Sequence, residues 1–114
     1  MVDSVDVTQL KLIDFGISSP YLKADGSHID FGKAKYNGNI LFSSVHMMQG
    51  LTLGRRDDLI SLAYLMIFMV EGNMFFLVDD ETKVHDFDYM RKCKTESTPE
   101  TLCRTRSREF FEFV

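Results

Sequence analysis

One uninterrupted apolar run constrains this chain more than any other feature. Residues 59–70 follow the sequence Arg-Arg-Asp-Asp at 55–58, and Ser61 is the clearly polar side chain within the run. At about 1.5 Å per residue, a helix of this length is too short for the roughly 30 Å hydrocarbon core of a membrane. Because the run is apolar on every side, it predicts a buried helix at about 57–70 that other elements surround.

A membrane-spanning alternative extends the same run to residue 78. It places Glu71, Gly72 and Asn73 in the middle of the span, at a cost of several kcal/mol. We therefore expect a buried helix in water and no membrane partner. The net charge of −4 and the lack of a basic cluster also predict no nucleic-acid partner. Without a secretory pattern at the first residues or a C-x-x-C pair, the expected location is intracellular, in the cytoplasm and/or nucleus.

The flanking segments predict a mainly α-helical chain. A short strand at about 10–13 precedes a long loop at 17–42, in which no helical or strand period persists. Ser43-Ser44 is a candidate cap for a short helix over 45–49 that Gly50 closes, and Gly72 is the stop of the central helix. Three further segments follow: a helix from 79–81 to 91–94, a helix start at Thr98-Pro99, and a final segment that Ser107 caps.

Asp14-Phe15-Gly16, directly after the predicted strand, is the candidate site for a metal ion. A carboxylate on a rigid strand end can reach a Mg²⁺ ion that bridges the phosphates of ATP, and glycine lets the chain turn away at once. The same three letters recur at Asp30-Phe31-Gly32 without a strand to hold them, so we interpret the second copy as coincidental.

Several blocks together resemble the casein kinase 1 family of serine/threonine protein kinases. They are Leu-Ile-Asp-Phe-Gly at 12–16, His-Ile at 28–29, Arg-Arg-Asp-Asp-Leu at 55–59, and Ser-Thr-Pro at 97–99 with Leu102-Cys103. The resemblance runs from about residue 11 to the end, and the block containing Arg56 and Asp58 is its most specific part. It implies a partial kinase domain over 1–114, namely a C-terminal lobe built around the 57–70 helix. In kinases the carboxylate at the position of Asp58 braces the backbone of the catalytic loop.

The resemblance has departures after the long loop. Where the family pattern is Thr-Gly-Thr-Ala-Arg-Tyr, residues 37–42 carry Gly38 as expected, but Asn39 replaces the threonine that buttresses the catalytic base. Leu41 replaces the arginine that binds a substrate phosphate, and it cannot bind an anion. The segment at 72–76 also lacks the proline and tryptophan of the family. The expected preference for primed or acidic substrates is therefore in question.

The sequence contains no glycine-rich phosphate loop, no strand lysine and no H-R-D…N catalytic loop. No catalytic residue is therefore assigned, and whether the chain is an enzyme stays open, because phosphoryl transfer needs these groups to converge. The resemblance implies a transferase segment that uses ATP and Mg²⁺ through Asp14, with Phe15, Gly16 and residues 17–42 as activation-type loop and a protein as substrate. It is expected to be inactive as this isolated chain. The alternative is a non-catalytic, pseudokinase-like remnant that acts as an interaction module.

Overall fold

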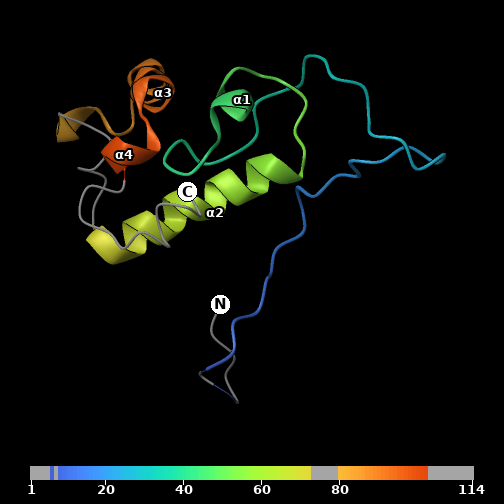
Figure 1. Ribbon diagram of the computed structural model, residues 1–114, viewed down its shortest axis with the longest axis horizontal. Coiled ribbons are helices and arrows are strands. Elements are labelled where there is room, and N and C mark those ends of the chain that lie inside the picture. The colour runs from blue at the N-terminus through green and yellow to red at the C-terminus, as the bar shows by residue number, and fades with distance from the viewer. Residues whose placement is uncertain (1–5, 7, 73–79, 103–114) are drawn as a thin grey trace.

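The computed structural model describes residue 6 and residues 8–72 and 80–102. This part of the chain is mostly helical, in the order α1 (Val45–Met48), α2 (Arg55–Glu71), the 3₁₀ turn η1 (Glu81–Lys83), α3 (Phe87–Glu96) and α4 (Pro99–Leu102). Figure 1 shows α2 as the longest helix, with α1, α3 and α4 on one side of it and the blue N-terminal segment extending away. The predicted mainly helical class is confirmed for the described residues.

Helix α2 begins two residues before the predicted start and ends at the predicted stop. At its beginning the Gly54 N–H donates to the carboxylate of Asp57 (2.9 Å). At its end Gly72 adopts the left-handed conformation (φ 75°), and its N–H donates to the Phe68 carbonyl. This is the conformation that glycine adopts without steric cost, which is why the helix ends there.

The prediction that other elements surround α2 on most sides is wrong for the described structure. Ile67 is fully buried and Tyr64 is 6% exposed, whereas Leu59 is 57% exposed and Met69 is 72% exposed. The physical reason is the one-sided arrangement of the short helices, which cover a single face of α2 (Figure 1). The other face carries apolar side chains in contact with solvent.

Two small apolar clusters hold the helices together. Met48 of α1 and Met90 of α3 form the first, and half-buried side chains from the end of the loop and from α3 pack around them: Tyr36, Ile40, Leu41, Phe42, Val84 and Phe87. The second cluster joins Tyr64 and Ile67 of α2 to Leu102 of α4. Edge-to-face aromatic pairs strengthen the junctions, for example between the rings of Phe42 and Phe68, whose centroids lie 5.6 Å apart.

The predicted capping residues define the short helices. The Ser44 hydroxyl accepts from the Met47 N–H at the start of α1, as expected. Thr98 precedes Pro99 at the start of α4, and its hydroxyl accepts weakly from Thr101 N–H (3.4 Å), which also agrees with the prediction. The predicted single helix from 79–81 to 91–94 is instead η1 followed by α3. The helix is interrupted because Asp86 caps a new one, accepting from the Tyr89 N–H.

Within the described part, the predicted strand at about 10–13 is reduced to a single bridge position at Leu10, and residues 11–13 are irregular. Leu10 and Leu12 are each 82% exposed, and an extended segment needs a partner strand for its backbone hydrogen bonds. Residues 17–42 form the long irregular loop that the sequence predicts. An isolated antiparallel β-bridge between Lys33 and Leu51 connects the loop to the segment before α2. The predicted segment at Ser107 and the 73–76 departure lie outside the described residues.

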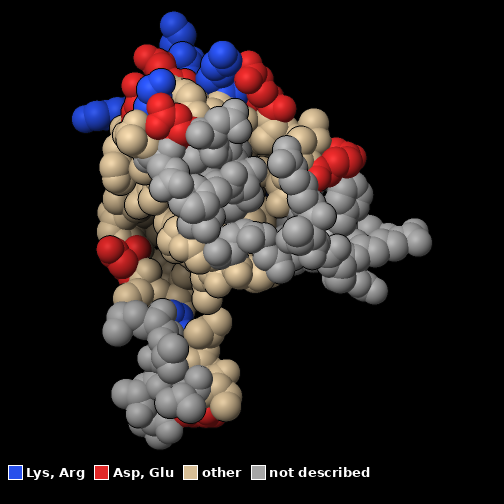
Figure 2. Space-filling view, turned by 90° about the vertical axis from the view of Figure 1, so that its left-hand side faces the viewer, with Lys and Arg blue, Asp and Glu red and all other residues tan. Residues whose placement is uncertain are grey.

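Acidic and basic side chains both gather around α3. Figure 2 shows blue and red side chains interspersed at the top of the face it displays, with tan side chains below them. The Lys83 ammonium lies 3.2 Å from Asp80, and the Arg91 guanidinium lies 2.9 Å from Asp88. Such exposed pairs contribute little to stability, so the apolar clusters and the buried polar groups described next hold the fold.

Candidate functional site

The Asp14-Phe15-Gly16 motif lies on an exposed extended segment. Asp14 has a positive φ of 62°, and it is the one non-glycine among the described residues with such a backbone. Its carboxylate accepts a long hydrogen bond (3.4 Å) from the Gly16 N–H, and Phe15 is 63% exposed. A side-chain-bearing residue adopts this conformation at a steric cost, and such strain gathers at functional sites. Of the two motif aspartates, Asp14 therefore has the more unusual backbone conformation.

The chemistry of Asp14 suits one ligand position of a magnesium site. Mg²⁺ is commonly held by one or two protein carboxylates together with waters and substrate phosphates. Within the described residues, no group of three or more His, Cys, Asp or Glu side chains gathers to hold a metal ion without such help. Asp14 could supply one carboxylate ligand of such a site.

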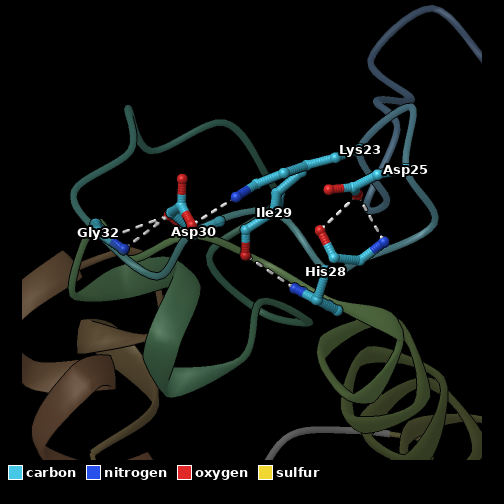
Figure 3. A network of polar contacts seen from close by, with 8 residues as sticks. Lys23, Asp25, His28, Ile29, Asp30 and Gly32 are labelled. Carbon is cyan, nitrogen blue, oxygen red and sulfur yellow. Dashed lines mark hydrogen bonds and ion pairs between the residues drawn. The ribbon is translucent and has the colours of Figure 1, made fainter.

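The second copy, Asp30-Phe31-Gly32, has a structural environment instead. The Lys23 ammonium donates to the Asp30 carboxylate at 2.7 Å, as Figure 3 shows. The Gly32 carbonyl accepts from the Thr52 N–H (2.9 Å), and the Gly32 N–H donates to the Thr52 hydroxyl (3.1 Å). In the same view the His28 ring lies against the Ile29 carbonyl (3.0 Å). These bonds fold the loop onto the segment that leads to α2.

Asp57 is the buried acid of the Arg-Arg-Asp-Asp block, and Asp58 is not. The Asp57 side chain has no exposure; it accepts from the Ser44 hydroxyl at 2.7 Å and from the Gly54 N–H at 2.9 Å. The Nδ1 atom of His46 lies 3.5 Å from the same carboxylate and has no hydrogen-bond partner within the described structure. Asp57 therefore joins the start of α1 to the start of α2.

Asp58, the next residue, is not buried. Its side chain is exposed, because one step along a helix turns a residue by about 100° and carries Asp58 away from α1. It lines a cavity of about 320 Å³ together with Asn37 and Arg55. A carboxylate at this place costs no desolvation energy, and it is open to donors that approach through the cavity.

Arg56 faces a different hollow. Its side chain is 59% exposed, and its Nε atom lies 3.8 Å from the Asp57 carboxylate. With His28, Phe31 and Arg55 it lines a cavity of about 340 Å³ at the start of α2. The Arg55 guanidinium lies 5.1 Å from the centre of the Tyr21 ring, which fixes it by a cation–π contact. The wall of this cavity at the start of α2 thus carries the positive charges of Arg55 and Arg56.

The remaining candidates shape the turn before α1. The Asn39 side-chain carbonyl accepts from the Leu41 N–H at 2.8 Å, so Asn39 here stabilises the local turn. A Cβ at Gly38 would collide with Met47 and Ser43, so only glycine fits there without a shift. Leu41 packs against the Met48–Met90 cluster.

Sequence reasoning missed Lys94, the buried cation of the structure. Its side chain is 3% exposed, and its ammonium donates at 2.7 Å to the carbonyls of Ile40 and Ser43. It also lies 4.6 Å from the centre of the Tyr64 ring. Burial lowers the pKa of Lys94 to about 7 and raises the pKa of the Tyr64 hydroxyl. The signal was present in the spacing from Met90, since a residue four positions later lies on the same helix face.

A search of protein-family models finds no match. A probable casein kinase I homolog of Encephalitozoon cuniculi is 40% identical over 67 residues, which make up 58% of this chain and 21% of that protein. A casein kinase 1-like protein of Oryza sativa subsp. japonica is 37% identical over 106 residues, 88% of this chain and 14% of that protein.

These matches confirm the predicted relationship. The curated homologues are casein kinase 1 family proteins, and the chain is similar to a part of them: the matched regions make up 21% and 14% of their lengths. No helix in the described ranges is long and apolar enough to cross a membrane.

Proposed function

We propose that this chain is the C-terminal-lobe segment of a casein-kinase-1-like serine/threonine protein kinase. In this proposal Asp14 holds the Mg²⁺ ion of ATP, Gly16 permits the turn after it, and residues 17–42 are the activation and substrate-recognition loop. Phosphoryl transfer to a protein substrate belongs to a longer chain, because the lysine, the base and the glycine-rich loop must come from elsewhere. The 114 residues alone bind no substrate productively and transfer no phosphate.

The exposed carboxylate of Asp58 carries the proposal. It has no hydrogen-bond or ion-pair partner in the described part of the chain, although the neighbouring Asp57 uses both of its oxygens. It faces a cavity of about 320 Å³ whose walls include Ile17 and Ser18, directly after the Asp14 motif. A loop that presents backbone N–H groups would fit there, since a carboxylate is a strong acceptor for them. This is the role that the resemblance gives to Asp58.

The two copies of the motif supply the test and its control. We expect a chimera, in which residues 10–102 replace the matching segment of the rice relative, to phosphorylate casein in the presence of ATP and Mg²⁺. Asp14→Asn in the chimera should lower the rate at least a hundredfold, because the metal loses its carboxylate ligand. Asp30→Asn removes only the exposed pair with Lys23 and should leave the rate within about twofold. Equal effects of the two substitutions would refute the role of Asp14.

A second candidate function is a non-catalytic interaction module. The observation that favours it is the uncovered apolar face of α2, where Leu62 is 44% exposed and Met69 is 72% exposed. Exposed apolar patches of this kind mark interaction sites in many proteins. Thermal denaturation of the chain with ATP and Mg²⁺ separates the two candidates. A Mg²⁺-dependent rise in melting temperature that Asp14→Asn removes would count against the module.

A further inference from the structure

A cavity of about 370 Å³ lies where α1, α2, α3 and α4 meet, away from the Asp14 motif and from the cationic wall of Arg56. The helices that form it lie on the same side of α2 (Figure 1). Most of its walls are apolar: Val45, Leu59, Ile60, Ala63, Ile67 and Leu102. Its volume is within the range of small-molecule sites, which combine apolar walls with a few polar groups.

The polar side chains of this cavity are two basic ones, Lys94 and His46, and two that carry hydroxyls, Tyr64 and Ser97. Lys94 and His46 both line it, and no Asp or Glu does among the described residues. Lys94 carries three N–H donors. The carbonyls of Ile40 and Ser43 accept two of them, which leaves the third donor on the side of the Tyr64 ring, itself a wall of the cavity. Lys94 has no carboxylate within ion-pair distance in the described structure.

A buried cation without an anion is unfavourable unless a counter-charge is supplied. We propose that this cavity binds a small amphiphilic carboxylate, whose apolar body occupies the α2 wall and whose carboxylate accepts the remaining N–H of Lys94. The inference is independent of the kinase proposal. Burial already lowers the pKa of Lys94 to about 7, and a bound carboxylate would raise it again by stabilising the charged form.

A monoanion with an apolar chain fits better than a phosphate. The single positive charge of Lys94 balances a monoanion, whereas the second charge of a dianion would stay uncompensated among largely apolar walls. Phosphate chemistry would instead be served by the separate cavity of Arg55 and Arg56. The cavity between the helices therefore selects a single carboxylate with a hydrocarbon or aromatic body.

The test compares decanoate with 1-decanol, a neutral ligand of the same chain length, by isothermal titration calorimetry on the whole 114-residue chain. At pH 6 we expect decanoate to bind at one site, at least tenfold more tightly than decanol. In Lys94→Met this preference should disappear, whereas it should persist in Lys92→Met, an exposed lysine on the same helix. Met69→Ser, on the uncovered face of α2 outside the cavity, should change neither affinity.

A second arm uses the unmodified chain, so that the result does not depend on the folding of the Lys94 variant. Decanoate stays ionised from pH 6 to 9, whereas Lys94 loses its proton in this range. The preference of the chain for decanoate over decanol should therefore fall at least tenfold from pH 6 to pH 9. His46 from α1 lines the cavity and Tyr64 from α2 faces the ammonium, so His46→Gln and Tyr64→Phe should keep most of this fall. Equal affinities for the two ligands at pH 6, or a preference that survives in Lys94→Met, would overturn the proposal. Loss of binding in Met69→Ser would likewise overturn it.

Discussion

Asp57→Ala tests whether the first acid of the pair, rather than the second, holds the lobe together. The substitution removes a charged acceptor of two hydrogen bonds, from the Ser44 hydroxyl (2.7 Å) and from the Gly54 N–H (2.9 Å). A hydrogen bond to a charged group contributes about 1.5–3 kcal/mol, and the loss of a helix cap costs about 1 kcal/mol. These contributions overlap, so we expect a loss of about 3 kcal/mol from a total of about 5–15 kcal/mol.

Asp58→Ala is the matched control, because the residue is adjacent, identical in chemistry and exposed. It loses only a favourable interaction with the helix dipole, which is about 0.3–1 kcal/mol. Asp57→Asn should fall between the two, since the amide keeps its shape but loses the charge. Urea denaturation followed by far-UV circular dichroism gives the three free energies, and amide hydrogen exchange in the first turn of α2 reports the same order locally. Equal losses for Asp57→Ala and Asp58→Ala would refute the reasoning.

Three further predictions concern stability. The pKa of Lys94 is about 7 when folded against 10.5 when unfolded, so between these pH values the unfolded chain binds more protons. The free energy of unfolding should therefore rise with pH from about 7 to about 10.5, by about 1 kcal/mol per unit, and a flat urea-midpoint profile would contradict this. Gly72→Ala should lower the free energy of unfolding by about 1 kcal/mol, because its φ is positive. Gly50→Ala should lower it by at least about twice as much, because the new Cβ would also lie 3.0 Å from the Ala34 carbonyl oxygen. Leu41→Arg should lower the free energy of unfolding by about 2 kcal/mol in the same assay, since it removes packing against the Met48–Met90 cluster. An unchanged urea midpoint would show that the Leu41 side chain is not part of that cluster.

Local signals predicted the ends of the helices well, because capping depends on neighbours in sequence. Ser44 starts α1 and Gly72 ends α2, as the residue types required. Asp86 carried the same kind of signal, but the acids at 79–81 competed with it, so the break between η1 and α3 was missed. The strand at about 10–13 failed for another reason: a strand exists only with a partner, and no residue within the segment specifies one.

The choice between Asp57 and Asp58 could not be made from the sequence. An amphipathic helix reveals its buried face by its pattern, but α2 is apolar all round, so its sequence is compatible with burial of any face. The position of α1 decided the matter by presenting the Ser44 hydroxyl to Asp57. For the same reason the uncovered face of α2, which includes Met69, could be placed only by the structure.

The two buried charges act on the same short segment from opposite sides. Lys94 of α3 binds the carbonyls of Ile40 and Ser43, and Asp57 of α2 binds the hydroxyl of Ser44. The end of the long loop is therefore fixed between two helices, whereas most of residues 8–39 are exposed to solvent. Neither charge contacts the Asp14 motif. These two buried ionisable groups thus anchor one end of the loop, and a change at either should alter the position of residues 40–44 without touching Asp14 itself.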